Sequence, residues 1–207
     1  MGKTKFIIGI DEAGRGPLAG PVTVGVVLIP MNFDWSLIKG VGDSKALSEK
    51  RRESVYETAE ALAVAIGLVP VVVFKSAKEI DKRGIAVVIR EALKEGLSQV
   101  LQRVSAKAED CLVLLDGSLK APAEFLQQET IIKGDAKEKI IGLASIYAKV
   151  RRDTYMVKLS KRKTFHCYDF ATHKGYGTKK HREAITEFGP SPEHRLSFCR
   201  NCLKEGI

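Results

Sequence analysis

The sequence has little cysteine and no long apolar run, and each absence excludes a class of protein. Four cysteines in 207 residues are too few for a disulfide-held secreted domain. Cys199 and Cys202 form a single CxxC near His194, and without a second pair a zinc site is only a weak alternative. The longest apolar runs, such as GLVPVVVF, are far shorter than a membrane helix. Met1 to Lys5 leads into a strand-like run without a signal segment, so we expect a soluble, cytoplasmic protein with no membrane partner.

Internal repeats, low-complexity tracts and linkers are also absent. A chain of 207 residues of this kind fits one domain with a small appended piece. We expect a main domain over residues 1–163 and a helical extension over residues 164–207 that packs on it. Acidic residues are outnumbered, with 34 Lys and Arg against 25 Asp and Glu, which gives a net charge of +9. This surplus favours a polyanionic partner, above all nucleic acid, although a basic protein without such a partner has the same balance.

The apolar pattern predicts an α/β fold with a mixed sheet, because strand-like runs come first and then alternate with helical ones. Ser48 is a plausible N-cap for a helix that runs to about Leu62, and Pro70 indicates an edge strand or a bulge. The expected strands cover residues 5–11, 21–30, 63–74, 111–117 and 128–135. The expected helices cover residues 49–62, 85–104 and 136–161, with a turn and a terminal helix within 172–189.

A glycine-rich turn, EAGRGPLAG, follows the first strand, but it does not fit a phosphate-binding loop. Gly9 and Gly14 have the spacing of G-x-x-x-x-G-K-[ST], yet Arg15-Gly16 stands where Lys-Ser/Thr is required. Gly14, Gly16 and Gly20 leave one residue too many for a dinucleotide fingerprint. Two carboxylates in the same turn would also repel a bare phosphate. Both kinds of site are therefore excluded.

Carboxylates stand at the ends of three expected strands. Asp11 and Glu12 end the first, Asp116 ends the run CLVLLDG, and Asp135 ends QETIIKGD. Carboxylates gathered at one edge of a sheet suit a hard divalent cation, and a pair of such ions can hydrolyse a phosphodiester. Strand alternation points Asp11 and Glu12 to opposite faces, so we expect the backbone to turn at Glu12. The turn offers these two charges no partner except Arg15.

Structural roles are the alternative for two of these carboxylates. Asp135 and Glu138 have the spacing of a helix capping box, and Asp116-Gly117 could form an ordinary turn. Asp153 is a further candidate ligand, but a continuous helix would put it roughly 27 Å from Asp135. We therefore expect Asp153 to form a surface ion pair with the arginines beside it.

Seven motifs in order, from end to end of the chain, resemble bacterial ribonuclease HII. They are GIDEAGRGPLAGPV, GDSKALS, LLDG, IKGDA, ASIYAKVRRD, HKGYGTKKH and GPSPEHRLSF. The resemblance implies a ribonuclease H-like fold with a small helical C-terminal extension. It also implies a divalent-metal-dependent endoribonuclease that cuts RNA within RNA–DNA hybrids and nicks ribonucleotide-containing duplex DNA 5′ of a single ribonucleotide. Such an enzyme would use Mg²⁺ or Mn²⁺, and we expect it to act as a monomer.

The resemblance also assigns roles to individual residues. The acidic metal site would consist of Asp11, Glu12, Asp116 and Asp135. The backbone of Gly14, Arg15 and Gly16 would lie against the ribonucleotide and sense its 2′-OH, the group that separates RNA from DNA. Tyr176 would stack on the next sugar, unless it merely packs in its Gly turn, and Lys45 would touch a phosphate, unless it is a solvated loop lysine. The duplex backbone would be gripped by Lys174, Lys179, Lys180 and Arg182.

Two other functions have to be compared with this one. A junction resolvase or exonuclease on the same fold would also need the carboxylates, but a DNA-only enzyme needs no 2′-OH sensor. A non-catalytic hybrid-binding protein would need the basic surface, but an intact acidic quartet would hinder its binding.

Overall fold

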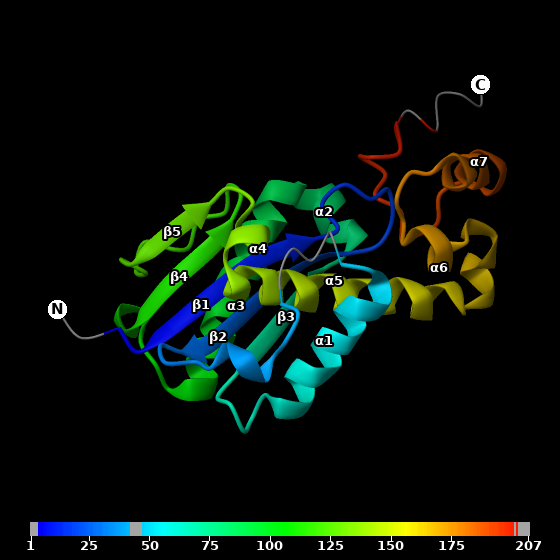
Figure 1. Ribbon diagram of the computed structural model, residues 1–207. Helices are drawn as coiled ribbons and strands as arrows, with labels where there is room; N and C mark the ends of the chain where they lie inside the picture. The colour runs from blue at the N-terminus through cyan, green and yellow to red at the C-terminus, as the bar shows by residue number, and fades with distance from the viewer. Residues whose placement is uncertain (1–3, 42–46, 201, 203–207) are drawn as a thin grey trace.

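A mixed five-stranded sheet forms the centre of the computed structural model, which describes residues 4–41, 47–200 and 202 (Figure 1). The strand order is β3-β2-β1-β4-β5. β1 is antiparallel to β2 and β2 to β3, whereas β4 is parallel to both β1 and β5. The strands are β1 (Phe6–Ala13), β2 (Val22–Pro30), β3 (Val69–Lys75), β4 (Cys111–Asp116) and β5 (Gln128–Ile131). The predicted α/β fold with a mixed sheet is confirmed.

Helices cover both faces of this sheet. One face packs against α3, and the other packs against α1 and α5 (Figure 1). No helix within the described ranges is long and apolar enough to span a bilayer. The helices are α1 (Glu49–Leu62), α2 (Ala77–Arg83), α3 (Ile85–Val104), α4 (Gly134–Lys137), α5 (Lys139–Ser160), α6 (Phe170–His173) and α7 (Lys179–Phe188). Short 3₁₀ helices cover Trp35–Leu37, Ala108–Asp110 and Lys163–Tyr168.

Glycines in the strands let α5 lie unusually close to the sheet. A Cβ atom on Gly9 would lie 2.4 Å from the carbonyl oxygen of Ile140, and one on Gly25 would lie 2.2 Å from that of Ala144. Helix backbone therefore rests directly on strand backbone. Since Gly25 pairs with Asp11, this contact brings the next turns of α5 beside the carboxylate end of β1.

Several predicted elements are confirmed because their signals are local. The Oγ of Ser48 accepts the Arg51 N–H at 3.3 Å and caps α1, which ends at Leu62. Pro70 lies in the edge strand β3. The amphipathic helix expected over residues 85–104 has those bounds.

The stretch between β4 and α5 differs from the prediction. β5 ends at Ile131 and not at Asp135, because Lys133 has a left-handed backbone (φ 56°) that reverses the chain. The long helix expected over residues 136–161 is broken at Glu138, whose backbone is extended (φ −116°). Asp135 consequently lies in the short helix α4 instead of at a strand end.

The C-terminal part packs on the end of α5 and on the loop between β1 and β2. Figure 1 shows that loop reaching toward α6, α7 and the C-terminal segment. The contact is an apolar cluster made by Ala19, Met156, Leu159, Phe165, Tyr168, Phe170 and Ala184.

Candidate functional site

A cavity of about 450 Å³ lies where the ends of β1 and β4 meet α5. A larger hollow of about 670 Å³ beside β3 has only one acidic residue, Glu60, among its described lining residues. The smaller cavity is the candidate site because acidic, glycine and aromatic residues from separate segments line it together. They are Asp11, Glu12, Ala13, Gly14, Arg15, Gly16, Arg52, Asp116, Ser145, Lys149 and Tyr176.

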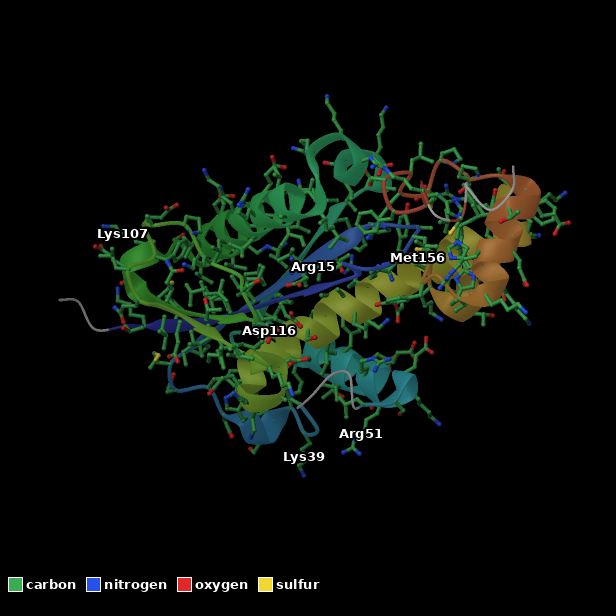
Figure 2. The ribbon with its side chains drawn as sticks, turned by 90° about the horizontal axis from the view of Figure 1, so that it is seen from above. Arg15, Lys39, Arg51, Lys107, Asp116 and Met156 are labelled. Atoms are coloured by element: carbon green, nitrogen blue, oxygen red, sulfur yellow. The ribbon has the colours of Figure 1, made fainter. Side chains whose placement is uncertain are left out.

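Parallel pairing brings the first and second predicted acidic segments together. Ile10 on β1 is paired with Leu115 on β4, so the next residues, Asp11 and Asp116, end neighbouring strands. Figure 2 shows Asp116 and Arg15 over the middle of the molecule, away from the end at which Lys107 lies. The expected edge-of-sheet cluster is thus present for these two carboxylates.

Asp11 is a buried carboxylate whose pKa is shifted. Its side chain is buried, and its Oδ1 accepts the Glu12 N–H at 2.7 Å. Its Oδ2 has no hydrogen-bond partner within the described part of the chain. Burial raises the pKa of Asp11 to about 7; a hydrogen bond from Ser145 opposes the shift, and the charges of Glu12 and Asp116 add to it.

The turn expected at Glu12 is absent, because β1 continues to Ala13 and stays paired with β2, with Glu12 opposite Val24. That prediction was wrong. Asp11 and Glu12 nevertheless both line the cavity. β4 ends at Asp116, so the last residues of β1 have no paired strand on the β4 side. Arg15 approaches the Glu12 carboxylate at 3.5 Å, as the sequence indicated.

The fourth predicted carboxylate, Asp135, lies in the turn next to Asp116. The Gly134 N–H donates to Oδ1 of Asp116 at 2.6 Å, which fixes this turn against the end of β4. Asp135 is buried but is not among the residues that line the cavity. The alternative capping box is wrong, because Lys133 is the N-cap of α4 and Glu138 makes no side-chain cap of α5.

The carboxylate oxygens that line the cavity are ligands that suit a hard divalent cation. Within the described ranges, no three His, Cys, Asp or Glu side chains are grouped so that they could hold a metal ion as they stand. Asp11, Glu12 and Asp116 nonetheless share the cavity, and their mutual repulsion contributes to the raised pKa of Asp11. A buried carboxylate oxygen without a protein partner is what an oxygen-binding cation would relieve.

The glycine loop presents two different surfaces. Gly14 is buried with φ +85°, and a Cβ atom there would lie 2.1 Å from Nε of Arg152. Gly16 is exposed, and a Cβ atom there would meet nothing within 4 Å. Arg15 between them is exposed as well. The loop therefore turns one side to the interior and the other to the cavity.

Tyr176 lines the same cavity as this loop and is 43% exposed. The Nζ of Lys149 lies 5.6 Å from the centre of its ring, and the guanidinium of Arg152 lies 5.7 Å from it. This exposure argues against the alternative, a tyrosine merely packed in its glycine turn. Lys45 lies outside the described residues.

Sequence reasoning missed Arg52, Ser145 and Lys149, which also line the cavity. It also misjudged Asp153, which is buried and bonded to Lys149 at 2.9 Å instead of forming a surface pair. Lys149 and Asp153 are four residues apart on one face of α5, so their spacing was a signal that could have found the pair.

The alternative zinc site is wrong. Both ring nitrogens of His194 are hydrogen-bonded, Nδ1 to the Ser191 N–H at 2.9 Å and Nε2 to His181 at 3.0 Å. Cys199 and Cys202 are buried in an apolar cluster with Ile185.

Comparisons with known proteins identify the family of this chain. The sequence profile of the family Ribonuclease HII matches residues 8–201. The chain is 43% identical to a ribonuclease HII of Geobacillus kaustophilus (strain HTA426) over 200 residues, which cover 96% of this chain and 70% of the relative. It is 41% identical to that of Caldicellulosiruptor bescii over 201 residues, covering 96% and 89%.

Solved structures share the fold. The ribonuclease H2 of Pyrococcus horikoshii OT3 superimposes with a TM-score of 0.69 at 26% identity, over 97% of this chain and 98% of the other. A Bst-RNase HIII in complex with Mn²⁺ gives 0.71 at 17% identity, over 99% and 71%. The predicted ribonuclease H-like fold is confirmed, and the chain belongs to the ribonuclease HII family of ribonuclease H hydrolases, which cleave RNA in RNA–DNA hybrids.

Proposed function

We propose that this enzyme both hydrolyses the RNA strand of hybrids and nicks duplex DNA immediately 5′ of a single embedded ribonucleotide. The observation that carries the proposal is that one cavity joins three carboxylates to a glycine loop and to Tyr176. Carboxylates alone would suit any metal nuclease on this fold. The open loop and the exposed ring, which line the same cavity as the carboxylates, add a means of reading a single sugar.

The metal site we propose consists of Asp11, Glu12, Asp116 and Asp135, holding Mg²⁺ or Mn²⁺. A bound pair of such ions would supply an activated water and stabilise the leaving oxygen. The water adds to the phosphorus 5′ of the ribonucleotide, and the bond to the 3′ oxygen breaks. The proton ends on that oxygen, which leaves a 3′-hydroxyl and a 5′-phosphate. For this chemistry Asp11 has to be ionised, and the positive charge of a bound cation would lower its raised pKa.

Substrate recognition is assigned to the loop Gly14–Gly16, Tyr176 and Lys45. Because Gly16 has open space on its cavity side, a sugar can approach the backbone there closely. The Tyr176 ring offers a flat face for the neighbouring sugar. We propose that residues 164–207, which carry Tyr176, are the substrate-binding extension of a catalytic domain over residues 1–163. The cytoplasmic location and the monomeric state stay predictions.

The test is cleavage of one DNA duplex that carries a single ribonucleotide, with Mg²⁺, with Mn²⁺ and with EDTA, beside its all-DNA control. We expect a metal-dependent nick 5′ of the ribonucleotide and no cut in the control. Cutting of the control would keep the metal site but favour a DNA nuclease. Binding of both duplexes without any cut would favour a non-catalytic binding protein.

A further inference from the structure

Two arginines, Arg152 and Arg195, are completely buried behind the glycine loop. Arg152 forms one long ion pair, with the Asp153 carboxylate at 3.9 Å. Within the described residues, Arg195 forms no ion pair. Burial, and then the neighbouring Arg152, lower the pKa of Arg195 to about 9, so it is still charged at neutral pH. A buried charge is costly unless hydrogen bonds compensate it. Both arginines are compensated by main-chain carbonyls.

Arg195 binds the inner side of the glycine loop. Its Nη2 donates to the carbonyl of Gly14 at 2.7 Å, its Nη1 to that of Arg15 at 3.0 Å and its Nε to that of Gly20 at 3.0 Å. The backbone N–H of Arg195 donates to the carbonyl of Leu18 at 2.8 Å. One planar guanidinium thus fixes the orientation of successive peptide groups along the loop.

Arg152 connects the same loop to the segment that carries Tyr176. Its Nε donates to the carbonyl of Pro21 at 2.9 Å, and its Nη2 donates to the carbonyl of Ala19 at 3.2 Å. Its Nη1 donates to the carbonyl of Lys174, two residues before Tyr176, at 3.0 Å. The two halves of the site, far apart in sequence, are therefore held by one side chain.

The contacts of Arg195 decide where the loop's N–H groups point. In a trans peptide the C=O and the following N–H point in opposite directions. With the carbonyls of Gly14 and Arg15 turned inward to the buried guanidinium, the N–H groups of Arg15 and Gly16 point outward, to the side that lines the cavity. Within the described residues, neither N–H donates to a protein acceptor.

We propose that Arg195, supported by Arg152, is a positioning residue for ribonucleotide selection. It holds two backbone N–H donors toward the sugar, and Arg152 sets their separation from Tyr176. This inference rests on the proposed function, because it names what gives the sensor its geometry. It assigns a role in discrimination to a side chain that touches no substrate.

The test measures two quantities in the same Mg²⁺ buffer. One is kcat/KM on the duplex with a single ribonucleotide, and the other is the inhibition constant of the all-DNA duplex as a competitor. Arg195→Lys keeps the charge but loses the three-way donation. We expect kcat/KM to fall about tenfold or more, as for loss of well-aligned hydrogen bonds, while the inhibition constant of DNA changes by less than about twofold.

Tyr168→Phe is the matched control. It removes a buried hydrogen bond to the carbonyl of Gly189 in the same C-terminal part and touches neither half of the sensor. Melting temperatures of both variants calibrate the loss of stability. A parallel loss of DNA binding in Arg195→Lys, or an equal loss of kcat/KM in Tyr168→Phe, would overturn the inference. A wild-type enzyme that ignores the ribonucleotide would instead overturn the proposed function.

A second measurement needs no variant. Amide hydrogen exchange of Arg15 and Gly16 in the wild-type protein should be fast when it is free. In EDTA, which prevents cleavage, the ribonucleotide duplex should slow the exchange of both amides more than the all-DNA duplex does. Equal slowing by the two duplexes, or slow exchange in the free protein, would contradict outward-pointing donors even if Arg195→Lys does not fold.

Discussion

Gly14 and Gly16 illustrate, at the residue scale, how one motif serves two physical needs. Gly14 is required by the interior, since its positive φ and the guanidinium of Arg152 leave no room for a side chain. Gly16 meets no such constraint from the protein, so its need for glycine comes from what enters the cavity. Both residues line the cavity, but only Gly14 is also constrained by the protein interior.

Alanine substitutions should separate these two needs. Gly14→Ala should lower the free energy of unfolding by about 2 kcal/mol or more, through backbone strain and the clash with Arg152. Gly16→Ala should leave the melting temperature within about 1 °C of wild type and still reduce kcat/KM on the ribonucleotide duplex at least about tenfold. Thermal unfolding and initial-rate assays on both variants check this. Full activity of Gly16→Ala would remove the loop from the substrate site.

The pKa of Asp11 predicts how the stability of the metal-free protein depends on pH. Its ordinary pKa is 3.8 and burial raises it to about 7, so between these values the folded state keeps a proton that the unfolded state releases. Stability should therefore fall as the pH rises from about 4 to about 7. In Asp11→Asn the side chain at position 11 cannot ionise, so this contribution to the loss of stability is absent.

Thermal unfolding in EDTA, compared at each pH between wild type and Asp11→Asn, tests this. The advantage of Asp11→Asn should grow with pH and level off above about pH 7. Adding Mg²⁺ at pH 8 should stabilise the wild type more than the variant. A difference that does not change with pH would show that Asp11 is not titrating there.

The position of the site depends, at the scale of elements, on how closely α5 approaches the sheet. Gly9 and Gly25 allow helix carbonyls to touch strand backbone, and Ser145 and Lys149 reach the carboxylate end of β1 as a result. If α5 lay further from the sheet, the side chains of Ser145 and Lys149 would lie further from Asp11. The strand glycines therefore act on the site without lining it.

Gly25→Ala tests this dependence. A Cβ atom there would lie 2.2 Å from a backbone oxygen of α5, so the helix has to move. We expect a loss of about 3 kcal/mol in the free energy of unfolding, together with reduced cleavage in whatever fraction stays folded. Gly16→Ala, where a Cβ atom meets nothing, is the control for a glycine change as such. A stable Gly25→Ala enzyme with full activity would show that the close contact is dispensable.

Elements with a strong local pattern could be predicted from the sequence, and those set by tertiary contacts could not. The helix over residues 85–104 has an apolar face, and its bounds follow from it. The break at Glu138 depends on how the Gly134 N–H meets Asp116, which no local pattern shows. In the site, motif and resemblance identified Asp11, while Lys149 was missed because Asp153, four residues further on, was paired with the arginines beside it instead.

At the scale of the whole molecule, the net positive charge points to a duplex-binding surface only when the exposed basic residues are identified. Of the lysines and arginine expected to grip the duplex, Lys174 pairs with Glu49 at 3.3 Å and Lys179 with Glu183 at 3.8 Å. Arg182 donates to the carbonyl of Gly177 at 2.9 Å. Lys180 is exposed and has no ion pair within the described ranges, so it is the best candidate for a direct phosphate contact.

Salt dependence of duplex binding tests this assignment. Each phosphate contact contributes about 0.9 to the slope of log K against log salt concentration, so Lys180→Gln should reduce that slope by about 1. Lys107→Gln is the control, because Lys107 lies at the opposite end of the molecule from Met156 and the C-terminal part (Figure 2). Equal slopes for Lys180→Gln and wild type would remove Lys180 from the duplex interface.

The contact between Arg195 and Gly14 joins residues 181 positions apart, and this has a consequence for the order of synthesis. During synthesis the proposed metal-binding carboxylates Asp11 and Glu12 are made long before Arg195, whose guanidinium is proposed to orient the glycine loop. A nascent chain that has not reached residue 195 would therefore carry these acidic residues without the side chain that we propose orients the sugar sensor. Such a chain would have little means of selecting a ribonucleotide.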